Sequence, residues 1–126
     1  PNQAYAVAVA SPYANARVKR IDTSKAKAAP GVLLVLTGAD AKADKLGELT
    51  AHPMPEEVGA PAGFRTWLPL ICDDRVRYVG DRVAFVIAET QMQARDAADL
   101  VEVEYEELPA VTDLEDAARE GAPKVW

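Results

Sequence analysis

The sequence predicts an α+β fold, a mixed β-sheet with two to three short helices packed on it, from three consecutive patterns. Residues 83–88 are an uninterrupted apolar run bounded by charge, which is typical of a strand buried on both faces. A helical pattern follows this run. Residues 101–106 then place apolar side chains at every second position, as in a strand with one solvated face. The central unit is therefore strand, helix, strand, and the 83–88 strand should be the centre of a sheet.

The helix between these two strands has a recognisable start. Thr90 and Gln93 fit a capping box, in which the Thr hydroxyl and the Gln side chain satisfy exposed backbone N–H groups reciprocally. Small residues then recur at helical spacing and allow the helix to lie close on a sheet: Ala94, Ala97, Ala98 and Val101.

The N-terminal part predicts two strands and a turn. Residues 4–10 alternate larger side chains with alanines, which is strand periodicity. Ser11 and Pro12 mark a turn. Residues 16–21 form a second predicted strand, in which Arg17 and Lys19 share one face and should point to water.

A short helix and a third strand follow. Residues 22–24, Asp-Thr-Ser, supply capping groups for a short Ala- and Lys-rich helix that residues 30–31, Pro-Gly, end. Residues 32–36 are a predicted buried strand, closed by Thr37 and Gly38.

Residues 41–69 break the pattern. Four prolines and three glycines are spread through the segment, and neither the helical nor the strand period is sustained. Phe64 and Trp67 lie in it, and large aromatic rings are costly to leave in water, so we expect both to pack on the core of the chain itself. The alternative hypothesis makes Trp67 an anchor buried against another part of a larger protein.

The remaining elements are short. Residues 68–72 and 75–79 are predicted strands, and residues 80–81 should turn the chain into the 83–88 strand as a hairpin. Asp113 can cap a final short helix.

Length and composition limit the possibilities. A chain of 126 residues is one domain by length and buries about two-thirds of its extended surface. Because 24 of its residues are alanines, close packing should matter more than large side chains. The charge of −6 argues against nucleic acid as a partner, and no apolar run approaches the roughly 18 residues of a membrane span.

The start of the sequence and its cysteine content carry two further expectations. The sequence opens at Pro1 and lacks an initiator Met, so we expect a piece of a longer protein; a processed N-terminus or a complete small protein are the alternatives. A single cysteine forms no internal disulfide and suits a reducing compartment. With no recognisable signal peptide, we expect a cytoplasmic protein.

Two residues are candidates for chemistry because each is the only one of its kind. Cys72 is the only thiol, but Asp73 and Asp74 follow it and would raise its pKa, so we expect a buried structural residue and no nucleophile. His52 is the only histidine and has no His or Cys at metal-ligand spacing, so we expect a solvated loop residue.

Acidic residues are candidates for cation binding. Glu102, Glu104 and Glu106 share one face of the 101–106 strand, and Asp96 and Asp99 lie on the preceding helix. Carboxylates can bind a hard cation, but the glycine turn and alternating ligands of a calcium loop are missing. A solvated acidic face is the better interpretation.

The charges are unevenly divided along the chain. Residues 1–50 carry seven bases and four acids, or +3, whereas residues 51–126 carry seven bases and 16 acids, or −9. Solvated faces explain the difference. The alternative hypothesis is that one of the two charged faces, such as the one with Arg17 and Lys19, steers docking onto a neighbouring domain or subunit.

Four segments in this order carry a resemblance to a known family. They read SPYANARVKRID at residues 11–22, APGVLLVLTGAD at 29–40, YVGDRVAFVIAET at 78–90 and ARDAADLVEVEYEELPAV at 94–111. This set resembles the N-terminal α/β hammerhead domain of the large chain of molybdenum hydroxylases, which include xanthine dehydrogenase, aldehyde oxidase and aerobic carbon monoxide dehydrogenase. The family commonly has a His at the position of Tyr13.

The resemblance implies a fold for this chain and places the redox chemistry in other parts of a larger enzyme. Residues 1–126 would be a single α/β hammerhead domain of a longer large chain that hydroxylates a carbon centre, or oxidises carbon monoxide, at molybdenum held by molybdopterin. Electrons would leave through 2Fe-2S clusters to FAD, on iron-sulfur and flavin domains or subunits.

No catalytic, cofactor-binding or metal-binding motif of the family falls within these residues. We therefore assign no catalytic, cofactor-binding or metal residue and expect the isolated chain to be inactive. Its implied role is structural, packing on the molybdenum-binding domain of the same chain. The alternative is a free-standing α+β protein-interaction module without catalytic activity.

Overall fold

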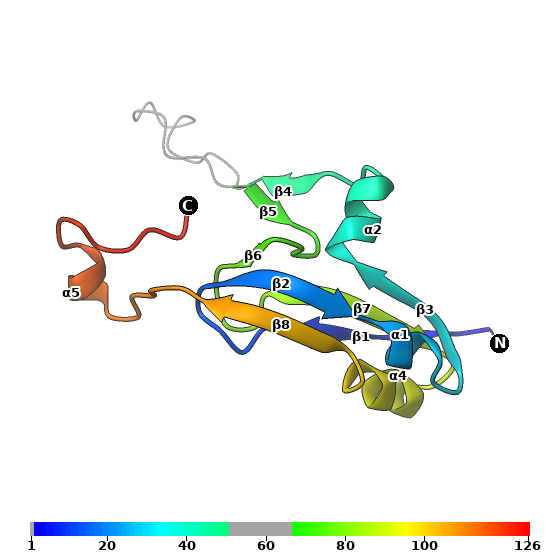
Figure 1. The fold of residues 1–126 in the computed structure, drawn as a ribbon. Coiled ribbons are helices and arrows are strands. Elements are labelled where there is room, and N and C mark those ends of the chain that lie inside the picture. The colour runs from blue at the N-terminus through cyan, green and yellow to red at the C-terminus, as the bar shows by residue number, and fades with distance from the viewer. Residues whose placement is uncertain (1, 51–66) are drawn as a thin grey trace.

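The computed structural model describes residues 2–50 and 67–126. Its strands are β1 Tyr5–Ala10, β2 Ala16–Asp22, β3 Val32–Thr37, β4 Glu48–Thr50, β5 Trp67–Pro69, β6 Arg75–Val76, β7 Arg82–Ala88 and β8 Glu102–Glu107. Its helices are α1 Ser24–Lys27, α2 Gly38–Ala43, α4 Gln91–Ala98 and α5 Leu114–Ala117 (Figure 1).

The predicted α+β class is confirmed, with the described strands arranged as small antiparallel sheets in place of one mixed sheet. The strand orders are β1-β7-β3, β6-β2-β8 and β4-β5. Every strand pair is antiparallel. The strand predicted to be central, β7, does lie between two others.

One face of the β1-β7-β3 sheet is covered by α4, which lies against β1 and β7 (Figure 1). Val86, Val35 and Ala97 belong to the core cluster between them, and each is at most 2% exposed. Small side chains on α4 allow this close approach, as the sequence predicts.

The start of α4 confirms half of the predicted capping box. The backbone N–H of Gln93 donates to the Thr90 hydroxyl oxygen at 3.2 Å. The Thr90 hydroxyl in turn donates to the Gln93 side-chain oxygen at 2.9 Å. The two side chains therefore bond to each other, where the sequence predicts that Gln93 bonds the backbone of Thr90.

A second core cluster joins the two three-stranded sheets. Ala16, Cys72, Val76 and Val83 are fully buried in it. A β-bulge interrupts the pairing of β1 with β7 between Val9 and Ala10, where β7 has one extra residue. Because of the bulge, the neighbours Val83 and Ala84 are both buried.

The predicted hairpin between residues 75–79 and β7 is wrong. β6 is only two residues long and pairs with β2, in a different sheet from β7. The reason is the turn at residues 80–81, which is bonded to the end of β1: Gly80 N–H donates to the Ser11 carbonyl, and Ser11 N–H donates to the Asp81 carbonyl, both at 2.8 Å. The Asp81 carboxylate also accepts from the Arg77 N–H at 3.0 Å.

The expectation that residues 41–69 are irregular is wrong for residues 41–43, 48–50 and 67–69, whereas residues 44–47 form neither helix nor strand. Residues 41–43 complete α2, and β4 pairs with β5. Helix α2 starts where a strand end was expected, because the Asp40 carboxylate accepts from both the backbone N–H and the hydroxyl of Thr37 at 2.7 Å. Residues 51–66 lie outside the described residues.

The C-terminal helix forms as predicted. One carboxylate oxygen of Asp113 accepts from the backbone N–H groups of Glu115 at 2.9 Å and Asp116 at 3.1 Å. The strand expected at residues 68–72 ends at Pro69. Among the helices that the structure describes, none has the length and hydrophobicity needed to cross a lipid bilayer.

Candidate functional site

Cys72 is held as a neutral buried thiol. The residue is 0% exposed and packs among the apolar side chains of the second core cluster. Burial, and then a hydrogen bond to the Asp81 carboxylate, raise its pKa to about 12. A nucleophilic cysteine needs a lowered pKa, so the arrangement favours the structural role that the sequence predicts. The main cause is burial, whereas the sequence pointed to the acids that follow Cys72.

The predicted acidic and basic faces form one surface. The register pairs Arg17 with Glu106 and Arg20 with Glu104, so both signs lie on the same face of β2 and β8. The Lys19 ammonium contacts the Glu106 carboxylate at 3.1 Å. This hydrogen bond lowers the pKa of Glu106. The premise of two separate charged faces is therefore wrong for these residues.

These ion pairs place the glutamates of β8 in a solvated, mixed-charge surface. Lys25 pairs in the same way with Glu102, which raises the pKa of Lys25. Water and salt screen exposed pairs of this kind, so each contributes little to the stability of the fold. Across residues 2–50 and 67–126, no group of three His, Cys, Asp or Glu side chains is placed to hold a metal ion.

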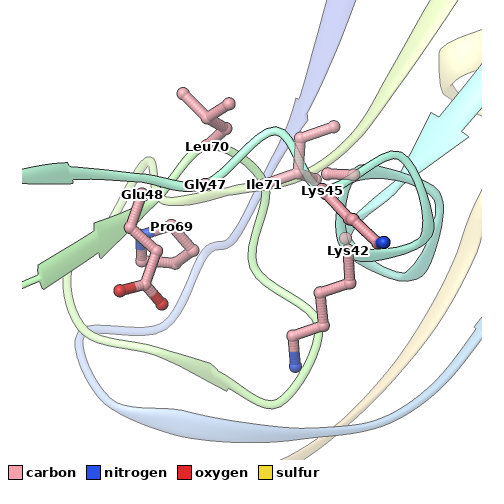
Figure 2. Close-up of a pocket in the computed structure, with 9 residues that line it drawn as sticks. Lys42, Lys45, Gly47, Glu48, Pro69, Leu70 and Ile71 are labelled. Carbon is pink, nitrogen blue, oxygen red and sulfur yellow. The ribbon is translucent and has the colours of Figure 1, made fainter.

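A cleft of about 330 Å³ lies between α2, the start of β4 and the end of β5. Its polar side chains are Lys42, Lys45 and Glu48. Figure 2 shows their charged ends pointing apart, without a common point at which a ligand atom could be held. The Lys42 ammonium is bonded to the Asp73 carboxylate at 2.6 Å. The cleft therefore lacks the converging polar groups of a small-molecule site.

Trp67 is not packed on the core. It is 50% exposed, so the expectation that its ring is enclosed by the chain itself is wrong. Its alternative role, as an anchor against another part of a larger protein, stays a prediction. Phe64 and His52 lie outside the described residues.

Asn15 is a buried polar residue that the sequence reasoning did not single out. It is 3% exposed. Its side chain donates to the Pro109 carbonyl at 2.7 Å and accepts from Arg75 Nε at 2.9 Å. Asn15 thereby ties the start of β2 to β6 and to the chain beyond β8. The sequence around Asn15 contains no pattern that would predict hydrogen bonds to residues so far away along the chain.

The fold and these residues define a domain whose polar groups serve packing and solvation, with no cluster of reactive side chains among the residues described. The family model for the a/b hammerhead domain of aldehyde oxidase and xanthine dehydrogenase matches residues 1–109. The chain belongs to this family.

Similar proteins agree with the assignment. The carbon monoxide dehydrogenase large chain of Afipia carboxidovorans is 42% identical over 123 residues, which are 98% of this chain and 14% of that protein. The crystal structure of quinoline 2-oxidoreductase from Pseudomonas putida 86 matches with a TM-score of 0.83 at 42% identity, over 97% of this chain and 15% of that one.

A Cu,Mo-CO dehydrogenase structure matches with a TM-score of 0.80 at 39% identity, over 98% of this chain and 14% of that one. The chain therefore spans about one-seventh of the length of the relatives that it matches. These relatives are oxidoreductases, and the part that is similar is one domain of each.

Proposed function

We propose that this chain is the structural N-terminal domain of the large chain of a molybdopterin-dependent oxidoreductase. The observation that supports the proposal is how the two chains align. The alignment with a carbon monoxide dehydrogenase large chain covers 98% of this chain but only 14% of that protein. In that relative the whole of this domain is a small part of one long polypeptide. The same relation holds for the quinoline 2-oxidoreductase structure.

The proposed enzyme carries out its chemistry outside these residues. When bound, molybdopterin supplies a molybdenum centre for oxidation or hydroxylation. We propose that this group binds outside these residues, because none of the family's cofactor-binding motifs occurs in this sequence. We therefore assign no residue of this chain to molybdenum, to 2Fe-2S clusters or to FAD.

The proposed direct partner is the molybdenum-binding domain of the same chain, with iron-sulfur and flavin domains or subunits completing the enzyme. The half-exposed ring of Trp67 supports a contact with another part of such a protein. A cytoplasmic location is also proposed, because a free buried cysteine suits a reducing compartment.

The substrate class is a carbon centre or carbon monoxide. Relatives named for carbon monoxide and for quinoline are both 42% identical to this chain, so identity in this domain does not discriminate between them.

The reading frame beyond Trp126 and the metal content of its product test the proposal. We expect the frame to run on into a large cofactor domain, and the purified full-length protein to contain stoichiometric molybdenum. The 126-residue chain alone should contain none and should oxidise neither aldehydes nor purines. A frame that stops soon after Trp126 would favour the free-standing interaction module.

A further inference from the structure

The β1-β7-β3 sheet has a second face that α4 does not cover, here called the outer face. The pairing of the strands aligns its side chains in two rows. Ile87 lies between Ala6 and Leu34 in one row, and Phe85 lies between Ala8 and Leu36 in the other. All six residues of the outer face are apolar: Ala6, Ala8, Leu34, Leu36, Phe85 and Ile87.

The outer face is open to solvent in this chain. Leu34 is 49% exposed, Ala6 and Ala8 are exposed, and the other three residues are half-buried. None of the six belongs to either core cluster. On the opposite face of the same strands, Val35 is 2% exposed and Val86 is fully buried. The sequence of β7 predicts burial on both faces, and the structure supplies a cover for only one of them.

The other three-stranded sheet shows how this chain builds a face that meets water. The outward side chains of β2 and β8 include Arg17, Lys19, Glu104 and Glu106, joined in part by ion pairs. The six residues of the outer face carry no charge and no hydrogen-bonding side chain; the charged Arg82, which pairs with Ala10, lies beyond them at the end of β7. Contiguous exposed apolar patches of this kind mark surfaces that contact another protein part, a membrane or a ligand.

We propose that, in the full-length large chain, the outer face is buried against an apolar surface of another segment of the same polypeptide. This inference rests on the proposed function and names the surface through which the domain is held. The relatives indicate the occupant, because each carries this domain as 14% or 15% of one continuous chain. A segment of the same chain is present at high effective concentration, whereas a second copy has to be recruited from solution.

Cysteine accessibility in the full-length protein, purified with its partner chains, tests the inference. Leu34→Cys places a thiol on the outer face, and Glu104→Cys is the matched control on the exposed charged face of β8. After a short maleimide pulse, peptide mass spectrometry measures labelling at each position. We expect Leu34→Cys to react at least about tenfold more slowly than Glu104→Cys in the native protein, and equally fast after denaturation.

Equal native labelling of the two variants would overturn the inference, because the outer face would then be open. Protection that disappears when dilution separates two copies of the protein, or when the partner chains are removed from the large chain, would also overturn it, since the cover would then be another chain. Hydroxyl-radical footprinting of the unsubstituted protein gives the same comparison at Leu34 and Phe85 if a variant fails to fold. Molybdenum content is measured on the same sample, so a protected face in a molybdenum-free protein counts against the proposed function alone.

Discussion

Arg75 Nε donates a hydrogen bond to Asn15 Oδ1 at 2.9 Å, across 60 positions of sequence. The backbone carbonyl of Asn15 also accepts from the Leu108 N–H at 2.9 Å. With the bond from its side chain to Pro109, this one buried amide residue fixes the ends of three segments.

Replacing Asn15 with Ala should therefore destabilise the chain strongly. The Asn15→Ala variant leaves the Pro109 carbonyl and Arg75 Nε without their partner at a part-buried site. The expected cost is about 2 kcal/mol or more of the free energy of unfolding. Urea unfolding measures it, and Gln3→Ala, which removes an exposed amide, is the control with a change below about 0.5 kcal/mol. Equal losses in the two variants would contradict the role given to Asn15.

Gly38 is needed because backbone approaches it closely. A Cβ atom at Gly38 would lie 2.6 Å from the Cβ of Asp73 and 2.7 Å from the carbonyl oxygen of Ile71. Gly38→Ala should push the start of α2 away from residues 71–73 and cost about 2 kcal/mol or more, measured by thermal or urea unfolding.

Gly47→Ala is the comparison for Gly38→Ala. Gly47 has φ +80°, but a Cβ there would meet nothing within 4 Å. Its substitution therefore tests backbone strain without a clash and should cost about 1 kcal/mol. If the two substitutions cost the same, the close contact at Gly38 does not matter.

The cap formed by Asp40 makes stability depend on pH. The Thr37 hydroxyl and backbone N–H donate to its carboxylate and lower its pKa. A lowered pKa in the folded state stabilises the fold above the ordinary value of about 3.9, and this stabilisation is lost as the pH falls through the lower folded-state value.

Asp40→Ala should accordingly cost about 1 kcal/mol at neutral pH, and its difference from the unsubstituted chain should shrink below about pH 4. Urea unfolding across this pH range measures the difference. Glu104→Ala, at an exposed site on β8, is the control for loss of a carboxylate. A difference that stays constant down to pH 2 would show that the Asp40 charge is not involved.

The buried thiol of Cys72 gives a prediction at the alkaline end. Because its pKa is raised to about 12, the native thiol should be inert to maleimide at pH 7 and should react once denaturant exposes it. In the unfolded chain the thiol ionises near pH 8.5, whereas in the folded chain it stays protonated. The free energy of unfolding should therefore be unaffected by this group below about pH 8.5 and should fall as the pH rises above it.

Cys72→Ala removes this alkaline dependence, although its stability at pH 7 is lower because the sulfur atom leaves a small cavity. Unfolding measured from pH 7 to 10 separates the two effects. Rapid maleimide labelling of the native chain at pH 7 would show that Cys72 is not enclosed.

The sequence predicts the central unit of the fold well because its signals are local. The apolar run of β7, the Thr90 cap and the alternation of β8 each arise within a few residues. The sequence does not predict α2 because Gly38 follows a predicted strand and looks like its end, although the Thr37 and Asp40 pair that starts the helix is visible in the sequence. Short strands such as β6 depend on a distant partner and carry no pattern of their own.

The expectations for the site residues also divide into those that depend on local sequence and those that depend on distant residues. Burial of Cys72 follows from residue type, and the structure agrees. The meeting of Lys19 with Glu106, 87 positions away, depends on the register between β2 and β8, which single-strand patterns do not contain. The exposure of Trp67 and of the outer face has a similar origin, because both depend on which parts of a protein surround the domain.

The strand order also has a consequence for how the chain is made. β1 and β3 both pair with β7, and β2 pairs with β6 and β8, so each of these early strands finds its described partners only after residue 74. When residues 1–74 have left the ribosome, the two apolar strands β1 and β3 therefore still lack β7, the strand with which both pair. During synthesis these strands should stay exposed to chaperones until β7 leaves the ribosome. The domain should therefore fold late, after most of its chain has been made.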